Sequence, residues 1–198
     1  MSRPVAFIDV DTQIDFMDSR GRLYVQGAET LAGNLSKLVK LAADRKIPLL
    51  QSLDTHLPDD PEFMVYPPHC IRGTSGHRKI RETEVPNARW VGVEQKDVGW
   101  NEGEALLVEK NTHSLYDNPN TPDIIRQVDA QEYVVFGVAT DVCVRATTLA
   151  LRDHGHRVTV VTDAVRPVRE QDGRKALAEL ERAGVHLATT EEIVKKWG

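Results

Sequence analysis

Short apolar runs alternate with segments of helical periodicity along the chain. Six runs rich in aliphatic residues predict strands at Val5–Val10, Pro48–Asp54, Ala105–Lys110, Glu132–Val138, Arg157–Asp163 and His186–Thr189. The segments between them predict helices at Thr30–Lys46, Thr121–Val128, Val142–His154, Gln171–Ala183 and Glu191–Trp197. This alternation predicts a three-layer α/β/α fold, in which helices cover both faces of a mostly parallel sheet of about six strands.

Local signals mark the ends of several predicted helices. Gly155 and Gly184 follow the third and fourth helices, at the position where a glycine commonly ends a helix. Thr189, with Glu192 three residues later, predicts a capping box at the start of the last helix. These signals support the division of the chain into short strands and helices.

Residues 55–104 depart from the alternation. They contain several prolines and glycines and little hydrophobic periodicity. So long an irregular segment inside a compact domain is usually functional. The total of 198 residues suits one domain with a sizeable core. We therefore predict a single domain over 1–198, in which 55–104 is an irregular insertion that contributes to the functional site.

Reactive side chains collect where predicted strands end. Asp11 follows the first strand, Asp54 ends the second, Lys110 ends the third, and Cys143 lies just beyond the fourth. In open α/β sheets the ligand crevice lies outside the carboxyl ends of the strands. Because four such residues come from four different strands, we predict a site at this edge of the sheet.

The segment around Cys143 offers a second indication of chemistry. Residues 137–144 predict a strand that turns into a helix near Asp141, with Cys143 in the first helical turn. Free backbone N–H groups and the helix dipole favour a thiolate there, and the same N–H groups can hold a developing oxyanion. A buried structural cysteine is the alternative, because free cysteine is often part of a core.

A nucleophilic thiol needs a base and a cation that stabilises the thiolate. Asp11 could accept the thiol proton, and Lys110 could hold Asp11 and lower the thiol pKa. Taken separately, an aspartate at a strand end usually caps a turn, and a lysine there usually reaches solvent. Together, on neighbouring strand ends, they form a candidate nucleophile, base and cation with Cys143.

A metal-ligand pattern begins at the end of the second strand. Asp54 and His56 are two residues apart, so an extended chain places them on the same side. His69 follows fifteen residues after Asp54 from a proline-rich segment, and Glu62 between them could be a fourth ligand. One carboxylate and two imidazoles suit zinc, iron or manganese. An isolated Asp-x-His pattern, however, often has no metal.

Composition excludes several other classes. The apolar fraction is 40%, the charged fraction 28% and the net charge −5, without a long run of Lys and Arg, so a nucleic-acid partner is not expected. No apolar stretch approaches the roughly 20 residues of a membrane helix, and the residues before the first strand show no signal-peptide pattern, so neither feature is expected. With two cysteines, the expected compartment is a reducing cytoplasm, and Cys70 is expected to be structural.

Four motifs occur in the order found in one enzyme family. Asp11–Phe16 is similar to D-x-Q-x-D-F, and residues 66–74 are similar to the loop F-P-x-H-C-x-x-G-T. Lys110 ends a strand, and residues 137–144 are similar to G-x-A-T-D-x-C-V. Over most of its length the chain therefore resembles the isochorismatase-like cysteine hydrolase superfamily, with its Rossmann-type topology, and within it the nicotinamidases most closely.

The resemblance implies a hydrolase that converts nicotinamide, or a close aromatic carboxamide, to the acid and ammonia through a thioester. Asp11, Lys110 and Cys143 would be the catalytic residues. It also implies a non-proline cis peptide before Ala139, which would bring the N–H groups of Ala139 and Cys143 into an oxyanion hole. Phe16 would pack on the substrate ring.

The same resemblance implies one divalent metal ion held by Asp54, His56 and His69, with zinc expected ahead of iron or manganese. A glutamate seven residues before the loop histidine is a further ligand in some relatives, and Glu62 stands there. The insertion 55–104 would thus bind metal and line the pocket. The resemblance also implies a homo-oligomer. A bound NAD is not expected, because the dinucleotide fingerprint G-x-G-x-x-G is absent.

One segment departs from the resemblance. Relatives commonly follow the catalytic lysine with an aromatic-Ser-Ala-Phe run, whereas this chain has His113-Ser114-Leu115-Tyr116 three residues after Lys110. This difference concerns the choice of amide substrate. Two alternatives to a nicotinamidase therefore stay open: a metal-free isochorismatase-like hydrolase or other amidase of the superfamily, and a non-catalytic metal-binding protein on the same fold.

Overall fold

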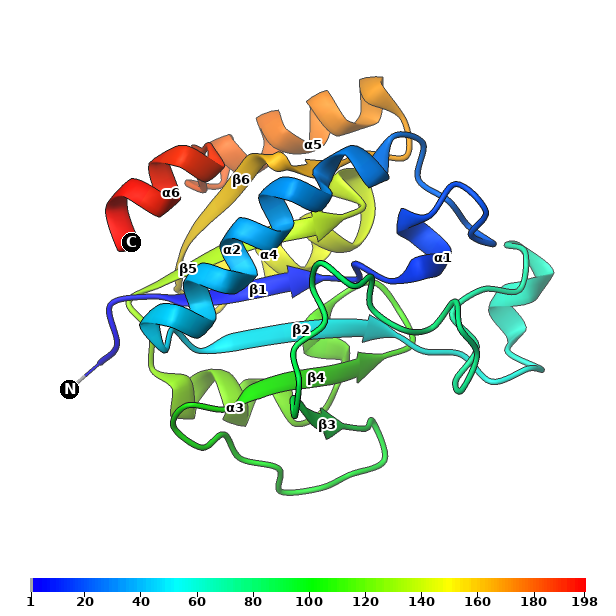
Figure 1. Ribbon diagram of the computed structural model, residues 1–198, viewed down its shortest axis with the longest axis horizontal. Helices are drawn as coiled ribbons and strands as arrows, with labels where there is room; N and C mark the ends of the chain where they lie inside the picture. The colour runs from blue at the N-terminus through cyan, green and yellow to red at the C-terminus, as the bar shows by residue number, and fades with distance from the viewer. Residues whose placement is uncertain (1) are drawn as a thin grey trace.

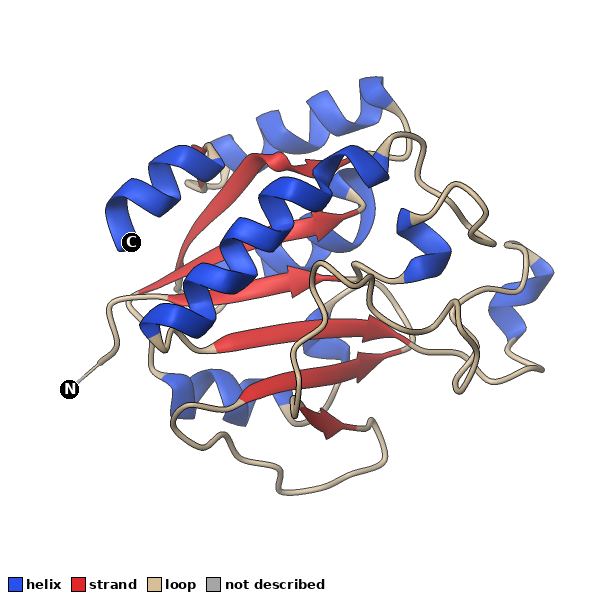
Figure 2. Ribbon diagram, in the orientation of Figure 1, coloured by secondary structure: helices blue, strands red, loops and turns tan. Residues whose placement is uncertain are grey.

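The computed structural model describes residues 2–198 and contains one parallel sheet (Figures 1 and 2). Its strand order is β3-β4-β2-β1-β5-β6-β7, and every pairing between these strands is parallel. The bounds are β1 Ala6–Val10, β2 Leu49–Asp54, β3 Arg89–Val91, β4 Ala105–Lys110, β5 Glu132–Val138, β6 Arg157–Arg166 and β7 His186–Ala188. The predicted α/β class and parallel sheet are confirmed.

Helices cover both faces of this sheet. The α-helices are α1 Ile14–Met17, α2 Ala32–Arg45, α3 Thr121–Val128, α4 Arg145–Asp153, α5 Glu170–Arg182 and α6 Thr190–Trp197. Shorter turns are the 3-10 helices η1 Ala28–Leu31, η2 Pro61–Met64 and η3 Leu115–Asp117, and the π-helical turn η4 Thr140–Val144. Among residues 2–198, no helix combines the length and the apolar character needed to cross a membrane.

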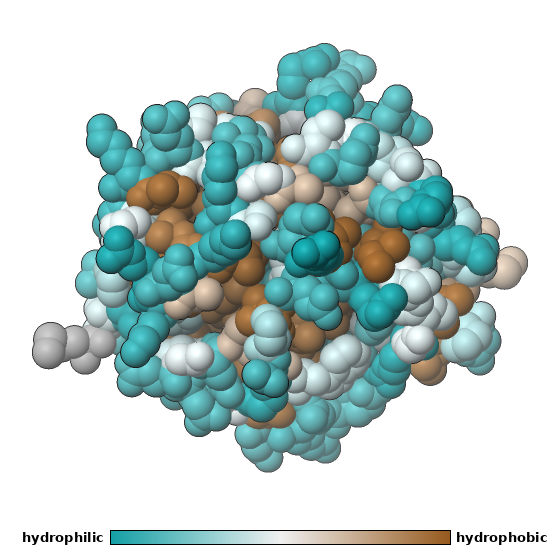
Figure 3. Space-filling model, viewed as in Figure 1, coloured by the Kyte–Doolittle hydropathy of each residue, from teal (hydrophilic) through white to brown (hydrophobic). Residues whose placement is uncertain are grey.

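Two apolar cores hold the three layers together. Alternate residues of β1 point to opposite faces, so Phe7 joins one core while Ala6 and Ile8 join the other. The first core packs the sheet against α2 and α6, and the second packs it against α3, α4 and α5. Both faces of the central strands are therefore covered, and the buried polar residues Asp9 and Gln51 lie within them. The face seen in Figure 3 is mainly hydrophilic, with apolar side chains gathered in separate patches.

The predicted count of about six strands is close to the seven observed. The additional strand is β3, which lies within the insertion and pairs with the outer side of β4. This strand has three residues, too few for a hydrophobic pattern, and pairing with β4 is what makes it a strand. The helix expected from Thr30 also divides, with η1 leading into α2. Helix ends were predicted more closely: Thr189 and Glu192 form the expected capping box before α6.

All the strands run in the same direction, so their carboxyl ends meet at one edge, on the right in Figure 1. The short helix α1 and the first part of the segment between β2 and β3 gather at this edge. Both chain termini lie at the opposite side. The fold thus brings the strand-end residues and the insertion into one region.

Gly137 generates a test of how tightly β5 packs on β1. It has a φ of 117°, and a Cβ there would overlap the backbone of Val10. We expect Gly137→Ala to lower the free energy of unfolding by about 3 kcal/mol or more, measured by urea denaturation. Gly155→Ala is the control, because Gly155 has a φ of 84° but no atom within 4 Å of its Cβ position. The free energy of unfolding of that control should fall by about 1–2 kcal/mol. Equal losses in both variants would contradict the steric overlap of a residue-137 Cβ with Val10.

Candidate active site and metal centre

A cavity of about 340 Å³ opens at the carboxyl edge of the sheet. Its lining includes residues from β2, α1 and η4 and from the loops that follow β1, η2 and β5: Asp11, Phe16, Asp54, His69, Ala139 and Cys143. Elements far apart in the sequence therefore supply one cavity. Its volume falls within the range of small-molecule sites, about 300–1,000 Å³.

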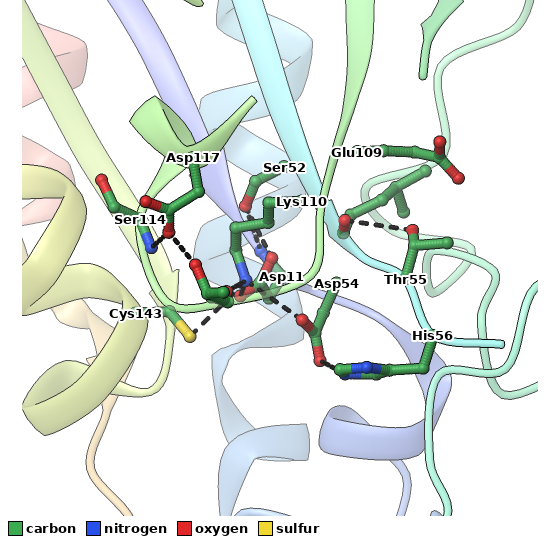
Figure 4. Close-up of polar contacts among 12 residues, drawn as sticks. Asp11, Ser52, Asp54, Thr55, His56, Glu109, Lys110, Ser114, Asp117 and Cys143 are labelled. Atoms are coloured by element: carbon green, nitrogen blue, oxygen red, sulfur yellow. Dashed lines mark hydrogen bonds and ion pairs between the residues drawn. The ribbon is translucent and has the colours of Figure 1, made fainter. Parts of the chain in front are cut away.

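The Lys110 ammonium group is the centre of this cluster (Figure 4). Its Nζ lies 2.9 Å from Asp11 Oδ2, 3.3 Å from Asp54 Oδ1 and 3.7 Å from Cys143 Sγ. The same atom donates a hydrogen bond of 2.7 Å to the carbonyl of Thr112. The Lys110 side chain is fully buried, so its charge acts on these neighbours with little screening from water.

Burial and charge set the ionisation of this cluster. Burial by itself would lower the pKa of Lys110, but the Asp11 and Asp54 carboxylates outweigh it and raise that pKa well above its usual value. Burial raises the pKa of the Cys143 thiol, and the Lys110 charge opposes that rise. The resting site therefore holds a charged lysine beside a neutral thiol, and the thiol needs a base to become a nucleophile.

Asp11 is placed to act as that base. It adopts a left-handed backbone conformation, with a φ of 47°. The Ser52 hydroxyl donates a hydrogen bond of 2.6 Å to Asp11 Oδ1 and accepts one of 3.1 Å from the Asp11 backbone N–H. The other oxygen, Oδ2, accepts no well-formed hydrogen bond, although it lies against Lys110. This oxygen thus has the capacity to accept a proton.

The backbone around Cys143 differs from the expected helix start. Cys143 lies in the π-helical turn η4, and the regular helix α4 begins only at Arg145. The peptide bond Val138–Ala139 is cis, as the resemblance implies. Both Ala139 and Cys143 line the cavity, so their backbone N–H groups are candidates for an oxyanion hole.

The Asp54 carboxylate contacts Lys110 through Oδ1, and its other oxygen faces His56 and His69. Asp54 Oδ2 lies 3.1 Å from His56 Nε2 and 3.3 Å from His69 Nε2. Each of the three residues offers one ligand atom, and these atoms all lie within 4.8 Å of one another. All three residues are buried. This is the donor set of one carboxylate and two imidazoles that the sequence indicated.

The second nitrogen of each histidine is held by an oxygen. His56 Nδ1 lies 3.0 Å from Asp60 Oδ2, and His69 Nδ1 lies 2.8 Å from the carbonyl of Pro67. In a neutral ring these acceptors favour the proton on Nδ1, which leaves the Nε2 lone pairs for a cation. The donor set therefore fits a divalent metal ion. Sequence reasoning missed Asp60, although an aspartate four residues after His56 was a signal available in the sequence.

Charge in the cluster also favours a cation. Burial would raise the pKa of Asp54, but the Lys110 charge and the hydrogen bonds from His56 and His69 lower it well below its usual range. Burial would lower the pKa of His56, but the hydrogen bond and charge of Asp54 raise it to about 9. The ionised Asp54 thus attracts positive charge at the histidines, which protons or a metal ion can supply.

Two further predicted residues lie near this metal centre. Glu62, in η2, lines the cavity and belongs to a second group with His56 and Asp60 whose donor atoms lie within 4.8 Å of one another. Phe16 is 8% exposed, and its ring centroid lies 5.5 Å from that of His69. Their roles as ligand and ring contact stay predictions.

His77 contacts the segment that carries two of the candidate metal ligands. It is buried, and its Nε2 lies 2.8 Å from the hydroxyl of Thr55, the residue between Asp54 and His56. The sequence pattern did not distinguish this histidine from ordinary surface or core positions. Cys70 is fully buried in the apolar core between the sheet and helices α2 and α6, in agreement with a structural role.

Comparison with known proteins places the chain in a family. Residues 5–192 match the family described as the isochorismatase domain. The nicotinamidase/pyrazinamidase of Mycobacterium tuberculosis is 30% identical over 92% of this chain and 97% of its own length. Nicotinamidase 1 of Arabidopsis thaliana is 36% identical over 61% of this chain, and that match spans 48% of the plant protein.

A solved structure shows the same fold. The pyrazinamidase of Pyrococcus horikoshii, in complex with zinc, superimposes with a TM-score of 0.80 at 24% identity, covering 93% of this chain and 98% of the other. In this chain a cysteine, a carboxylate and a lysine meet at the carboxyl edge of the parallel sheet. The chain belongs to the isochorismatase family.

The two thiols should differ sharply in reactivity. We expect iodoacetamide near neutral pH to label Cys143, which lines the cavity, and to leave the buried Cys70 unmodified. Lys110→Met should slow labelling at Cys143 tenfold or more, because the charge that opposes the rise in thiol pKa is removed. Peptide mass spectrometry measures both rates.

The matched control for this experiment is Lys79→Met. Lys79 is another buried lysine, and its ammonium group lies 3.2 Å from Asp9 Oδ2 and donates a hydrogen bond to the Thr12 hydroxyl. This variant should lose stability but label Cys143 at the wild-type rate. Equal slowing by both lysine variants would mean that general destabilisation, and not the charge of Lys110, governs the thiol.

His77 generates a prediction on pH. Burial and the Arg72 charge lower its pKa to about 4, below the roughly 6.5 of an unfolded histidine. The folded state therefore favours the neutral ring, so this stabilisation is complete above pH 6.5 and is lost as the pH falls towards 4. We expect urea denaturation to show a loss of about 2–3 kcal/mol over that window that His77→Gln abolishes. His186→Gln, at an exposed position, is the matched control variant.

Proposed function

We propose that the protein hydrolyses nicotinamide, or a close aromatic carboxamide, to the carboxylic acid and ammonia. The observation that carries this proposal is the Asp54 carboxylate, which contacts Lys110 through Oδ1 and both ligand histidines through Oδ2. A thiol site and a metal site therefore share one cavity. A flat heteroaromatic amide can present its amide to one site and its ring to the other.

Cys143, Asp11 and Lys110 supply the covalent chemistry in this proposal. Asp11 accepts the thiol proton, and the Cys143 sulfur attacks the carboxamide carbon. The N–H groups of Ala139 and Cys143 hold the oxyanion, and protonated Asp11 gives its proton to the departing ammonia. Water then adds to the thioester, with Asp11 as base, and releases the acid and the free thiol. Lys110 remains charged throughout and stabilises the thiolate.

Asp54, His56 and His69 would hold the metal ion, for which zinc is our first assignment and iron or manganese suit the same donors. When bound, the ion would supply a Lewis-acid contact for the ring nitrogen of the substrate. Phe16 packs against His69 and would bound the ring on one side. The insertion 55–104 supplies both histidines and Glu62, so we propose that it is the metal-binding and pocket-forming part of a single domain.

The segment after Lys110 bears on which amide fits. His113 lines the cavity, and the Ser114 hydroxyl caps η3 by accepting a hydrogen bond from the Tyr116 N–H. The chain therefore presents an imidazole where relatives with the aromatic-Ser-Ala-Phe run present apolar groups. We propose that this segment adjusts the choice among aromatic carboxamides, while the thiol chemistry is unchanged.

Ammonia release from nicotinamide tests this function. We expect release by the purified protein to fall after chelation and to return when zinc, manganese or iron is added, because the ion orients the ring. Cys143→Ala should lower turnover by about 10³-fold or more, as expected when a nucleophile is removed. Cys70→Ala is the matched control, since it removes the other thiol from the core and should retain turnover.

The possible outcomes separate the alternatives. Turnover that survives complete chelation would favour a metal-free amidase of the same superfamily. A Cys143→Ala variant with near wild-type turnover would rule out the thioester. A wild-type protein that binds zinc but releases no ammonia, with Cys143 still alkylated, would exclude nicotinamide and direct the search to other amides.

A further inference from the structure

The motif that begins at Asp11 contains buried polar residues with no part in the chemistry above, among them Gln13 and Asp15. Gln13 is fully buried directly before α1. Its Nε2 donates hydrogen bonds of 2.8 Å to the Asp54 carbonyl and 2.9 Å to the His77 carbonyl, while its Oε1 accepts one of 2.8 Å from the Asp54 N–H. One side chain thus holds both backbone polar groups of Asp54.

The position of Asp54 matters because its two carboxylate oxygens have different partners, Lys110 on one side and the two histidines on the other. Rotating or shifting its backbone would weaken both sets of contacts together. Gln13 lies two residues after Asp11, and its N–H donates a 2.7 Å hydrogen bond to the Asp11 carbonyl. A short, buried connection therefore runs from the proposed base to a proposed metal ligand.

Asp15 makes the equivalent connection to the other ligand segment. Its Oδ2 accepts a 2.8 Å hydrogen bond from the backbone N–H of Cys70, the residue after His69. Its Oδ1 accepts one of 3.0 Å from the Arg22 N–H. The carboxylate is 6% exposed, and a side chain at Gly76 would collide with it. The loop that carries His69 is therefore fastened directly to α1.

We propose that Gln13 and Asp15 are positioning residues that hold Asp54 and His69 at the separation a metal ion requires, in register with Asp11. The inference rests on the metal site of the proposed function. Asp54 ends a strand and His69 belongs to a loop, so neither segment sets the place of the other. Residues 13–15 hydrogen-bond to both, and outer-shell bonds of this kind commonly change metal affinity 10- to 100-fold.

Gln51 provides a matched control, because it is a second fully buried glutamine with similar bonds elsewhere. Its Nε2 donates to Asp9 Oδ2 at 2.6 Å and to the Thr83 carbonyl at 2.7 Å. It lies on β2, the strand that carries Asp54, but its side-chain amide donates to Asp9 and Thr83 and not to Asp54 or the His69 loop. Replacing either glutamine by methionine removes a buried amide of the same size, and only the Gln13 change should disturb the metal ligands.

The experiment measures the zinc dissociation constant by competition with a chromophoric chelator, on protein shown to be folded by circular dichroism. We expect Gln13→Met to weaken zinc binding 10- to 100-fold, and Gln51→Met to stay within about threefold of wild type. Iodoacetamide labelling of Cys143 should stay within threefold of wild type in Gln51→Met, which would show that this control leaves the thiol site intact. Equal zinc affinity in wild type and Gln13→Met, or equal weakening in both variants, would overturn the proposal.

A second variant serves if Gln13→Met does not fold. Gln13→Glu keeps the acceptor for the Asp54 N–H but turns the donor towards two carbonyls into an acceptor, and it should also weaken zinc binding tenfold or more. Asp15→Asn should do the same through the His69 loop. Wild-type protein that binds no zinc would overturn the metal site and this inference together. Wild type that binds zinc, with variants that bind it equally well, would overturn the inference alone.

Discussion

The buried ammonium of Lys110 is the interaction on which the rest of the site depends. Two carboxylates, Asp11 and Asp54, lie against it, and all three side chains are buried. Removing one member of a buried ion pair typically costs 3–5 kcal/mol, because an uncompensated charge remains. The sheet brings the three charged residues together, because β4, β2 and β1 are neighbouring strands. The register places Asp54, at the end of β2, directly beside Lys110, at the end of β4. Parallel strands with buried faces leave their ends as the place where such charges meet.

This ion cluster makes the thiol and the metal centre parts of one electrostatic unit. Asp54 places one oxygen on Lys110 and the other on His56 and His69, so a change of charge on either side is felt on the other. Burial strengthens that coupling, since there is little water to screen it. The insertion therefore contributes to the electrostatics of the site as well as covering the edge of the sheet. It carries His56 and His69, whose imidazoles contact a carboxylate that belongs to the sheet.

Regular elements and strand-end chemistry were the predictable part of the structure. The bounds of β4, β5 and α3 agree with the predicted ranges because the apolar runs of the two strands and the amphipathic pattern of the helix are undisturbed. Strand β3 was missed because it owes its conformation to pairing with β4, which a three-residue pattern cannot express. The π-helical turn at Cys143 was missed for a related reason, since small and β-branched residues there are equally compatible with an ordinary helix start.

The contacts of Gln13 show where sequence reasoning reached its limit. Its side chain bonds to the backbone of residues 41 and 64 positions away, and a bond to a main-chain group requires no particular residue at the other end. Metal ligands and nucleophiles reveal themselves by residue type and spacing, because the chemistry restricts which side chains serve. A side chain that holds a distant backbone has no such partner pattern, so its role emerges only when the fold brings the segments together. For this reason a buried polar residue inside a catalytic motif is better assigned from its backbone contacts than from its neighbours in sequence.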